Sequence, residues 1–295
     1  MKKNVIWRMS ALTCIGNFRT LAIRFRRKHN QIFNPHYSFK IAAVFFISVL
    51  IAYSAPSFAQ NSDQTQKTTR VSGAVTFTTK GISTIPSFTL GKPAVTFDLS
   101  VSRGKFSFEP QLRFAVFEGK PWTFIFWGRY KLVSNDKLSV IVGGHPAFSF
   151  KNKTYLVGGT STQTMVVKRY LAGDLAPLFN LSKKISIGPY YLYSHGVEND
   201  IVKNTHFISA RVNFTNIALG EQYFIKLSPQ IYYLKTDRED GYYYNASLSL
   251  VKKNFPFSLS SLFNKTIRST VQGSKDFIWN ISLIYSFSKR YIAVK

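Results

Sequence analysis

The stretch from Val95 to Val116 alternates apolar and polar side chains through two runs, which are joined by a tight reversal at Arg103-Gly104-Lys105. Successive side chains of a β-strand point to opposite faces, so each run has one apolar and one polar face and the two runs form a hairpin. Each run is about ten residues long, the length that a tilted strand needs to cross a bilayer. Strands of soluble proteins average about five to six residues. The pattern therefore favours a membrane barrel over a soluble sandwich, whose outer face is also polar.

The apolar faces of this hairpin and of the last predicted strand are expected to face lipid. They hold Val95, Phe97, Leu99, Val101, Phe106, Phe108, Leu112 and Phe114 in the hairpin, and Phe277, Trp279, Ile281, Leu283, Tyr285 and Phe287 in the last strand. The polar faces of the strands are expected to line the lumen. Their candidate residues are Asp98, Glu109, Gln111, Arg113, Arg129, Lys131, Arg211, Lys226 and Gln230.

Two readings of this lumen stay open. Opposite charges in a narrow interior can pair and fill it, because buried charges need partners. A surplus of Arg and Lys can instead favour anions in an open path. On consecutive strands, Asp98 and Glu109 are expected to face Arg113 and Arg129. Across the lumen, Arg211 and Lys226 have no obvious acidic partner on their own strands.

Twelve segments are predicted as strands, at about 70–79, 95–103, 105–116, 122–133, 137–148, 164–173, 185–195, 205–216, 222–235, 241–252, 257–264 and 276–287. Short turns are expected at 103–105, 134–136, 182–184 and 252–256, and longer loops at 80–94, 149–163, 196–204 and 264–275. Such alternation of short and long connections is typical of outer-membrane barrels. The prediction is an all-β, transmembrane, antiparallel up-and-down β-barrel of about twelve strands, with ten to fourteen possible.

Residues 1–59 read as a leader and a signal peptide. Lys40 precedes an apolar core at 41–53, and Ser57-Phe58-Ala59 supplies small residues before a cleavage after Ala59. The core is short for a membrane helix, and an uncleaved signal anchor is the alternative. The expected organisation is therefore a leader and signal peptide at 1–59, a flexible lead-in at 60–69 and a barrel at 70–295.

The formal net charge of +26 does not indicate nucleic acid in this chain. Nine of the 39 Lys and Arg residues lie in residues 1–59, and the others are scattered over turns and polar strand faces. No basic helix, P-loop or zinc-ligand spacing accompanies them. We expect the charge to contact anionic lipid head groups or polysaccharide, and we expect no nucleic acid partner. The only cysteine, Cys14, leaves the remaining chain without an internal disulfide, which suits an exported protein that folds without one.

Aromatic residues make up 16% of the chain and gather near the ends of predicted strands. Tyr232 and Tyr233 face Tyr242, Tyr243 and Tyr244 across a short connection. Tyr and Trp prefer the two head-group layers of a bilayer, where they form girdles on membrane barrels. Ordinary aromatic pairing across the strands of a soluble sheet is the alternative.

The last strand ends on Tyr285-Ser286-Phe287, and in this it resembles the last strand of bacterial outer-membrane β-barrel proteins. In that family an alternating aromatic pattern is read by the barrel-assembly machinery, although here residues 288–295 follow it. The stretches 169–177 and 189–196 are similar to uncharacterised barrel proteins of Bacteroidota. The resemblance covers roughly residues 70–290. It implies a porin-like architecture in a bacterial outer membrane, reached through a cleaved signal peptide. Lipids, lipopolysaccharide and the assembly machinery are then the implied partners, and no activity or oligomeric state is implied.

Catalytic chemistry is weakly supported. Ser194-His195 is the candidate nucleophile and base, with Asn199 and Asp200 nearby, but adjacent residues of a strand point to opposite faces. No G-x-S-x-G elbow is present, and His145 and His206 lack Cys or carboxylates at metal-ligand spacing. We expect no catalytic residue, metal or cofactor.

The leading hypothesis is a non-enzymatic outer-membrane barrel, either a narrow pore for small polar or anionic solutes or a closed structural barrel. One alternative is a barrel enzyme that acts on lipid or lipid A. The other is a secreted soluble β-sandwich that binds polysaccharide.

Overall fold

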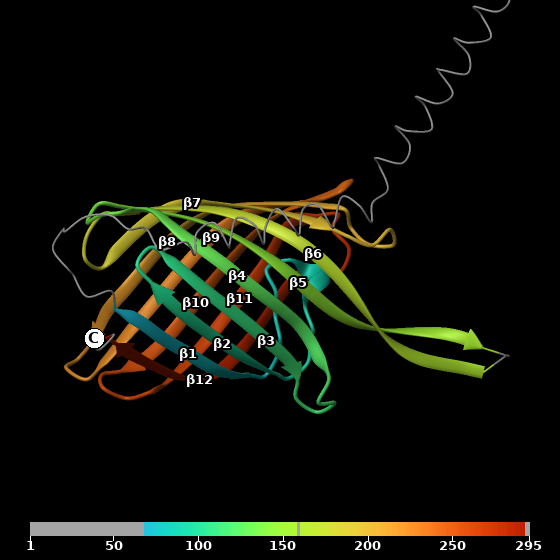
Figure 1. Ribbon diagram of the computed structural model, residues 1–295, viewed down its shortest axis with the longest axis horizontal. Helices are drawn as coiled ribbons and strands as arrows, with labels where there is room; N and C mark the ends of the chain where they lie inside the picture. Colours follow the sequence, from blue (N-terminus) through green and yellow to red (C-terminus); the bar gives the residue numbers. More distant parts are fainter. Residues whose placement is uncertain (1–67, 158–159, 293–295) are drawn as a thin grey trace, which may run out of the picture. The chain divides into compact units, whose positions relative to one another are not determined.

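The computed structural model describes residues 68–157 and 160–292, which form a closed antiparallel barrel of twelve strands (Figure 1). Each strand pairs with the next one along the chain, and the last pairs with the first. The strands are β1 (Thr69–Thr78), β2 (Ala94–Arg103), β3 (Phe106–Ala115), β4 (Pro121–Ser134), β5 (Leu138–Val157), β6 (Thr160–Asn180), β7 (Ile185–Gly196), β8 (Asn204–Leu219), β9 (Tyr223–Thr236), β10 (Glu239–Lys252), β11 (Phe257–Ser269) and β12 (Phe277–Tyr291). The predicted all-β up-and-down barrel is confirmed.

All twelve predicted strands are present, but the loop expected at 149–163 is wrong. β5 continues to Val157 and β6 begins at Thr160, and the two pair with each other beyond Ser149. This extension lies outside the closed part of the barrel, so neither of its faces packs on a core and its sequence lacks the strict alternation of the other strands. β6 also runs through Gly173, where the predicted strand ended. The lead-in was expected to reach Thr69, which is the first residue of β1, and the predicted leader and signal peptide lie outside the described residues.

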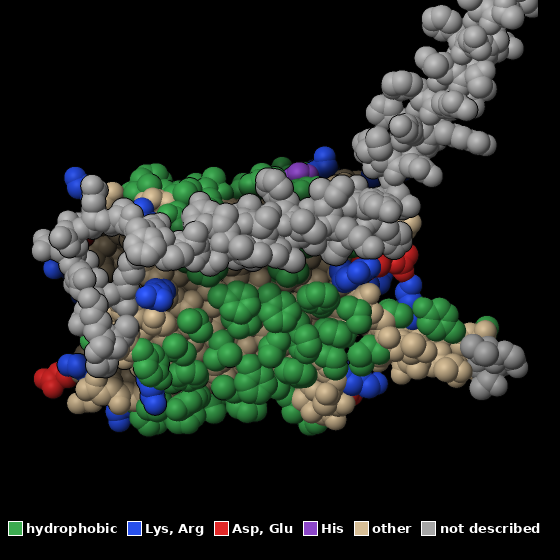
Figure 2. Space-filling view, viewed as in Figure 1, with side chains coloured by type: hydrophobic (Ala, Val, Ile, Leu, Met, Phe, Trp, Pro, Cys, Tyr) green, Lys and Arg blue, Asp and Glu red, His purple; other side chains and the backbone are tan. Residues whose placement is uncertain are grey.

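Exposure alternates along the strands as the period of two requires. In β12 the apolar residues from Phe277 to Phe287 at odd positions are exposed, whereas Ile278, Asn280 and Ser282 are buried inside the barrel. The fourteen residues predicted to face lipid all lie on the outer face, where Figure 2 shows a broad apolar surface. No helix in the described ranges is long and apolar enough to cross a membrane.

The two ends of the barrel differ. Thr69 pairs with both Tyr291 and Arg103. β1 therefore begins and β12 ends at the same end of the barrel, which we call the terminal end. The connections there are short, whereas the opposite end, the loop end, carries the connections 79–93, 116–120, 197–203 and 270–276. Gly104 has a φ of 60° in the turn between β2 and β3, a conformation that glycine adopts without a Cβ clash.

The paired extension of β5 and β6, residues 150–157 and 160–168, projects from the loop end as a two-stranded arm (Figure 1). The connection 197–203 holds the base of this arm. Glu198 accepts hydrogen bonds from the side chain of Arg169 at 2.6 Å and from its backbone N–H at 2.8 Å. Asp200 pairs with Lys153, and the hydrogen bond from this lysine lowers the pKa of the exposed Asp200 carboxyl.

Residues 79–93, which connect β1 to β2, fold into the barrel, and we call them the inner loop. They contain the one-turn 3₁₀ helix η1 (Pro86–Phe88). Besides Thr78 at the end of β1, which donates to the Lys80 carbonyl at 3.1 Å, four side chains from outside the loop donate hydrogen bonds to its backbone carbonyl oxygens. Three come from the barrel wall, Asn280 to Lys80 at 2.9 Å, Tyr232 to Thr84 at 3.0 Å and Trp122 to Phe88 at 2.9 Å, and one comes from the base of the arm, Lys151 to Ser87 at 2.9 Å. Because these donors come from β12, β9, β5 and β4, the inner loop lies across the interior.

Candidate functional site: the barrel interior

A network of charged and polar side chains crosses the interior face from β3 to β7. The guanidinium of Arg129 lies 3.1 Å from the Glu109 carboxylate and 2.7 Å from that of Asp174. The Tyr190 hydroxyl donates to Asp174 at 3.0 Å, and Ser107 donates to Glu109 at 2.7 Å. The carboxylate of Asp174 is completely buried. Two carboxylates thus share one guanidinium, and among the described residues the second oxygen of the Asp174 carboxylate, Oδ1, is buried without a hydrogen-bond partner.

The strand register explains how Arg129 reaches Asp174. Gly143 on β5 is the partner of Arg129 on β4 and of Asp174 on β6, so it lies between them on the interior face. A Cβ atom at Gly143 would come within 2.5 Å of an Asp174 carboxylate oxygen. The absence of a side chain at this position therefore lets the ion pair form across an intervening strand.

An aromatic stack adjoins this network. The Arg129 guanidinium carbon lies 3.8 Å from the Trp127 ring centroid, an arrangement typical of a cation–π contact. The His145 ring lies 3.8 Å from the same indole, centroid to centroid. Both rings face the interior and border a cavity next to the inner loop.

Two other interior guanidiniums lack a carboxylate partner. Arg113 donates to Gln111 at 2.9 Å and lies 5.5 Å from the Trp122 ring centroid. Arg211 lies 5.3 Å from the Tyr190 ring centroid, and its buried Nε has no hydrogen-bond partner among the described residues. In the described part of the chain, neither arginine forms an ion pair within 4.0 Å. The interior wall therefore carries positive charge that is not neutralised by contact.

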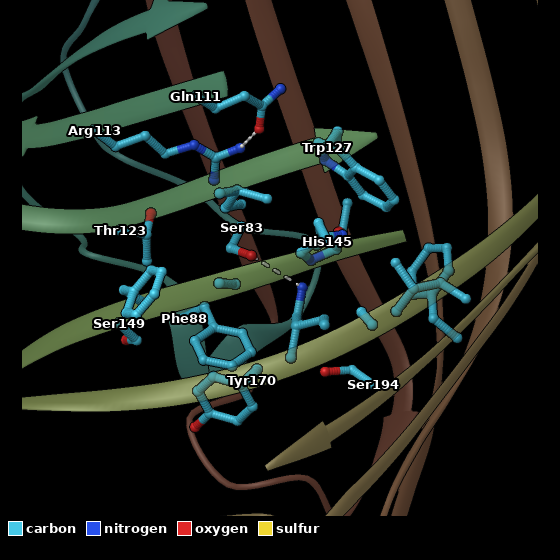
Figure 3. A pocket seen from close by; sticks show the side chains of 18 of the residues that line it. Ser83, Phe88, Gln111, Arg113, Thr123, Trp127, His145, Ser149, Tyr170 and Ser194 are labelled. Carbon is cyan, nitrogen blue, oxygen red and sulfur yellow. Dashed lines mark hydrogen bonds between the residues drawn. The ribbon is translucent and has the colours of Figure 1, made fainter. Parts of the chain in front are cut away.

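The inner loop divides the interior space. One cavity of about 320 Å³, which we call the loop cavity, lies between the inner loop and the wall and is bordered by Phe88, Arg113 and His145 (Figure 3). A neighbouring cavity of about 310 Å³ shares Arg113 and also contacts Asp98. A third, of about 300 Å³, lies on the other side of Phe88 and is bordered by Lys92, Lys120 and Lys151.

The nine residues predicted to line the lumen do not form one group. Glu109 and Arg129 meet in the ion-pair network, and Gln111 contacts Arg113. Asp98 borders a cavity beside Arg113, but in the described part of the chain the two form no ion pair within 4.0 Å, so of the expected carboxylate–guanidinium pairs only Glu109 with Arg129 forms. The second carboxylate of the network is Asp174, which the predicted strand boundary at residue 173 excluded.

The remaining candidates form no ion pair with the network in the described residues. Arg211 pairs in register with Gln230 across β8 and β9. Lys226 is exposed, with its amine 5.9 Å from the Phe224 ring centroid. Lys131 is also exposed and lies at a register irregularity between β4 and β5. Lys131 lies two residues beyond Arg129 on the same face of β4, toward the terminal end, whereas Lys226 lies on β9.

Ser194 and His195 point to opposite faces. Ser194 is buried and borders the loop cavity, whereas His195 is exposed on the outside and lies 3.4 Å from the side-chain oxygen of Asn204. The two residues therefore cannot act as a nucleophile and its base. Within residues 68–157 and 160–292, no group of three or more His, Cys, Asp or Glu is arranged to hold a metal ion.

No family model matches the sequence. No curated protein matches it either. Solved structures similar to the chain include the KdgM porin, with 12% identity and a TM-score of 0.43 over 73% of this chain and 99% of that one. The NanC porin has 12% identity and a TM-score of 0.42 over 75% of this chain and 100% of that one. An outer membrane channel from Pseudomonas putida F1 has 8% identity and a TM-score of 0.44 over 77% of this chain and 100% of that one. Likenesses of this size carry no information about the solute that a barrel takes.

Proposed function

We propose that the chain is an integral outer-membrane barrel that conducts small anionic solutes along a path narrowed by the inner loop. The observation that carries this proposal is the positive charge of Arg113 and Arg211, which no carboxylate contacts within 4.0 Å in the described residues. Pores lined by a surplus of Arg or Lys favour anions. The three interior carboxylates of the described residues, Asp98, Glu109 and Asp174, equal the three arginines in number, so the preference rests on where the charges lie. Glu109 and Asp174 are both held on Arg129, and in the described residues Asp98 forms no ion pair with Arg113 or Arg211, whose guanidiniums therefore keep N–H donors for a passing anion.

The loop end adds to the positive field. Lys120 and Lys151 border the cavity outside Phe88, together with Lys92, which pairs with Glu118 at 2.5 Å. Clustered like charges at the mouth of a cleft raise the local concentration of ions of opposite sign. An anion that approaches from the loop end thus meets lysines before it reaches the arginines of the interior.

The outer surface supports membrane insertion. Large apolar side chains are exposed all along the outer face, for example Leu99, Phe108 and Trp279. Surfaces of this extent need a lipid or protein cover. The proposal includes a mature protein that begins near residue 60, contacts with outer-membrane lipids and lipopolysaccharide, and insertion by the barrel-assembly machinery. The relation to barrel proteins of Bacteroidota stays a prediction.

Planar-bilayer recordings in a salt gradient test the function. The wild-type protein should show a reversal potential toward the anion equilibrium potential. Arg113→Gln combined with Arg211→Gln should move this potential toward the cation side, because both changes remove interior charge. Arg103→Gln is the matched control, since Arg103 is exposed at a turn of the terminal end. Cation preference in the wild type would overturn the proposal.

A closed structural barrel is the second candidate, favoured by the four hydrogen bonds that hold the inner loop across the interior. It predicts that the wild-type protein passes no current. Deletion of residues 82–90, which removes the inner part of this loop, should then open a conductance.

A further inference from the structure

The loop cavity contains buried polar atoms that the protein itself does not satisfy. The Thr123 hydroxyl and the Nδ1 of His145 are both buried and have no hydrogen-bond partner in the described structure. Both residues border the cavity, from the neighbouring strands β4 and β5. Buried polar groups without a partner are uncommon in folded proteins, and they are typical of positions where a ligand or water binds.

A guanidinium faces the same space. Arg113 makes one hydrogen bond in the described structure, to Gln111, and the guanidinium has further N–H donors in a planar fork. This fork matches the two oxygens of a carboxylate. The residues that border the cavity, all within the described ranges, include no Asp or Glu, and the carboxylate beside Arg113, Asp98, borders the neighbouring cavity instead.

The rest of the lining is largely aromatic. The Phe88 ring from the inner loop lies 4.9 Å from the Tyr170 ring, centroid to centroid and edge to face. The Trp127 and His145 rings border the same cavity (Figure 3). Aromatic walls favour a flat apolar body over a strongly hydrated one.

We infer that the loop cavity binds a small monocarboxylate with a flat apolar body, whose carboxylate pairs with Arg113 and whose ring packs near Phe88 and Trp127. The inference deepens the proposed function and rests on it for the route by which the solute arrives. The volume of about 320 Å³ lies at the lower end of the range for small-molecule sites. His145 and Thr123 supply the neutral polar contacts.

Binding to the full-length protein in detergent tests the inference without any need for current. Benzoate is the probe, and calorimetry together with quenching of tryptophan fluorescence measures its affinity. Benzamide keeps the ring without the charge, acetate keeps the charge without the ring, and glucuronate carries a hydroxylated ring. Benzoate should bind at least tenfold more tightly than each of the three.

Two variants locate the site. Arg113→Gln should weaken benzoate binding at least tenfold, whereas Arg103→Gln, which removes an exposed charge at a turn of the terminal end, should leave it unchanged. Circular dichroism and heat-dependent mobility on gels report that both variants are folded. Arg113→Lys gives a further check, because it keeps the charge but loses the fork and should bind with intermediate affinity.

The outcomes separate the two proposals. Anion conduction without benzoate binding leaves the pore intact and overturns the site. Benzoate binding lost in Arg113→Gln, in a protein that passes no current, supports the site and overturns the pore. Equal affinity for benzoate and benzamide overturns the role of Arg113, and tighter binding of glucuronate overturns the flat apolar body.

Discussion

Arg129 and Asp174 are 45 positions apart in the sequence, yet the Nη1 of the first lies 2.7 Å from the Oδ2 of the second. The contact crosses β5 at Gly143, which pairs with both residues. It joins the wall built by β3 and β4 to the one built by β6 and β7. The ion pair therefore connects β4 to β6 across β5 on the interior face of the barrel.

Asp174→Asn should destabilise the barrel. The change removes the charge of a completely buried carboxylate that accepts from both Arg129 and Tyr190. Loss of a charged hydrogen-bond partner at a buried site costs about 1–3 kcal/mol. Urea unfolding in detergent micelles measures this loss. Asp98→Asn is the control, since Asp98 forms no ion pair within the described structure, and an equal loss in the control would contradict the role of the ion pair.

Adjacent glycines of β5 should respond differently to alanine. A Cβ at Gly143 would lie 2.5 Å from an Asp174 carboxylate oxygen, whereas a Cβ at Gly144 would lie 3.5 Å from its nearest neighbour. Gly143→Ala should destabilise by about 1–3 kcal/mol through overpacking and displacement of the carboxylate. Gly144→Ala should be nearly neutral. The same unfolding assay compares them, and equal stability of both variants would contradict the proposed geometry.

A charge on the outer face should block assembly. Leu99 is 44% exposed on the outside of β2, and its neighbour Ser100 points into the barrel. Arginine on the lipid face of a membrane barrel costs about 2–4 kcal/mol at the bilayer midplane. Leu99→Arg should therefore reduce insertion into lipid vesicles, whereas Ser100→Arg should insert almost normally. Equal insertion of the two variants would show that the outer face does not contact lipid.

Removal of two hydrogen bonds to the inner loop should widen the path. Trp122→Phe and Tyr232→Phe delete donors to the carbonyl oxygens of Phe88 and Thr84 and keep a six-membered aromatic ring at each position, and Tyr232→Phe also removes the hydrogen bond to Asn264 on β11. A typical intramolecular hydrogen bond contributes about 0.5–1.5 kcal/mol. The double variant should therefore show a higher mean single-channel conductance with larger fluctuations than the wild type.

The control for this experiment is Tyr233→Phe, because the Tyr233 hydroxyl donates to Asp240 and does not contact the inner loop. Its conductance should equal that of the wild type. Unchanged conductance in the double variant would show that the inner loop does not limit the path.

Much of the fold is predictable from the sequence, because strand alternation is a local property. The apolar residues of β12 alternate from Phe277 to Phe287, and a window of about ten residues is enough to recognise such a strand. The same alternation predicts that Ser194 and His195 point to opposite faces of their strand, as they do in the structure. Predicted strand boundaries are wrong where the alternation is interrupted, as at Gly173 and Pro177. The interior carboxylate of Asp174 follows Gly173 directly, so the sequence does not predict it as a lumen residue.

The path of the inner loop could not be predicted. Residues 80–94 read as a loop in the sequence, but nothing in their composition indicates whether they lie inside or outside the barrel. Their position depends on side chains from distant strands, such as Trp122 on β4 and Asn280 on β12. The loop cavity follows from the same long-range contacts, because one of its walls is the loop itself.

The side chains that hold the inner loop donate to backbone carbonyl oxygens of the loop. Every amino acid has such a carbonyl, whatever its side chain. Side chains of the loop such as Ile82 and Ser87, which border cavities on either side, do not provide these four contacts. The amino acids at positions such as 82 and 87 can therefore change during evolution without loss of these four hydrogen bonds to the loop backbone. A single barrel of this design can acquire new solute preferences through substitutions in one short segment, without rebuilding the strands that insert it into the membrane.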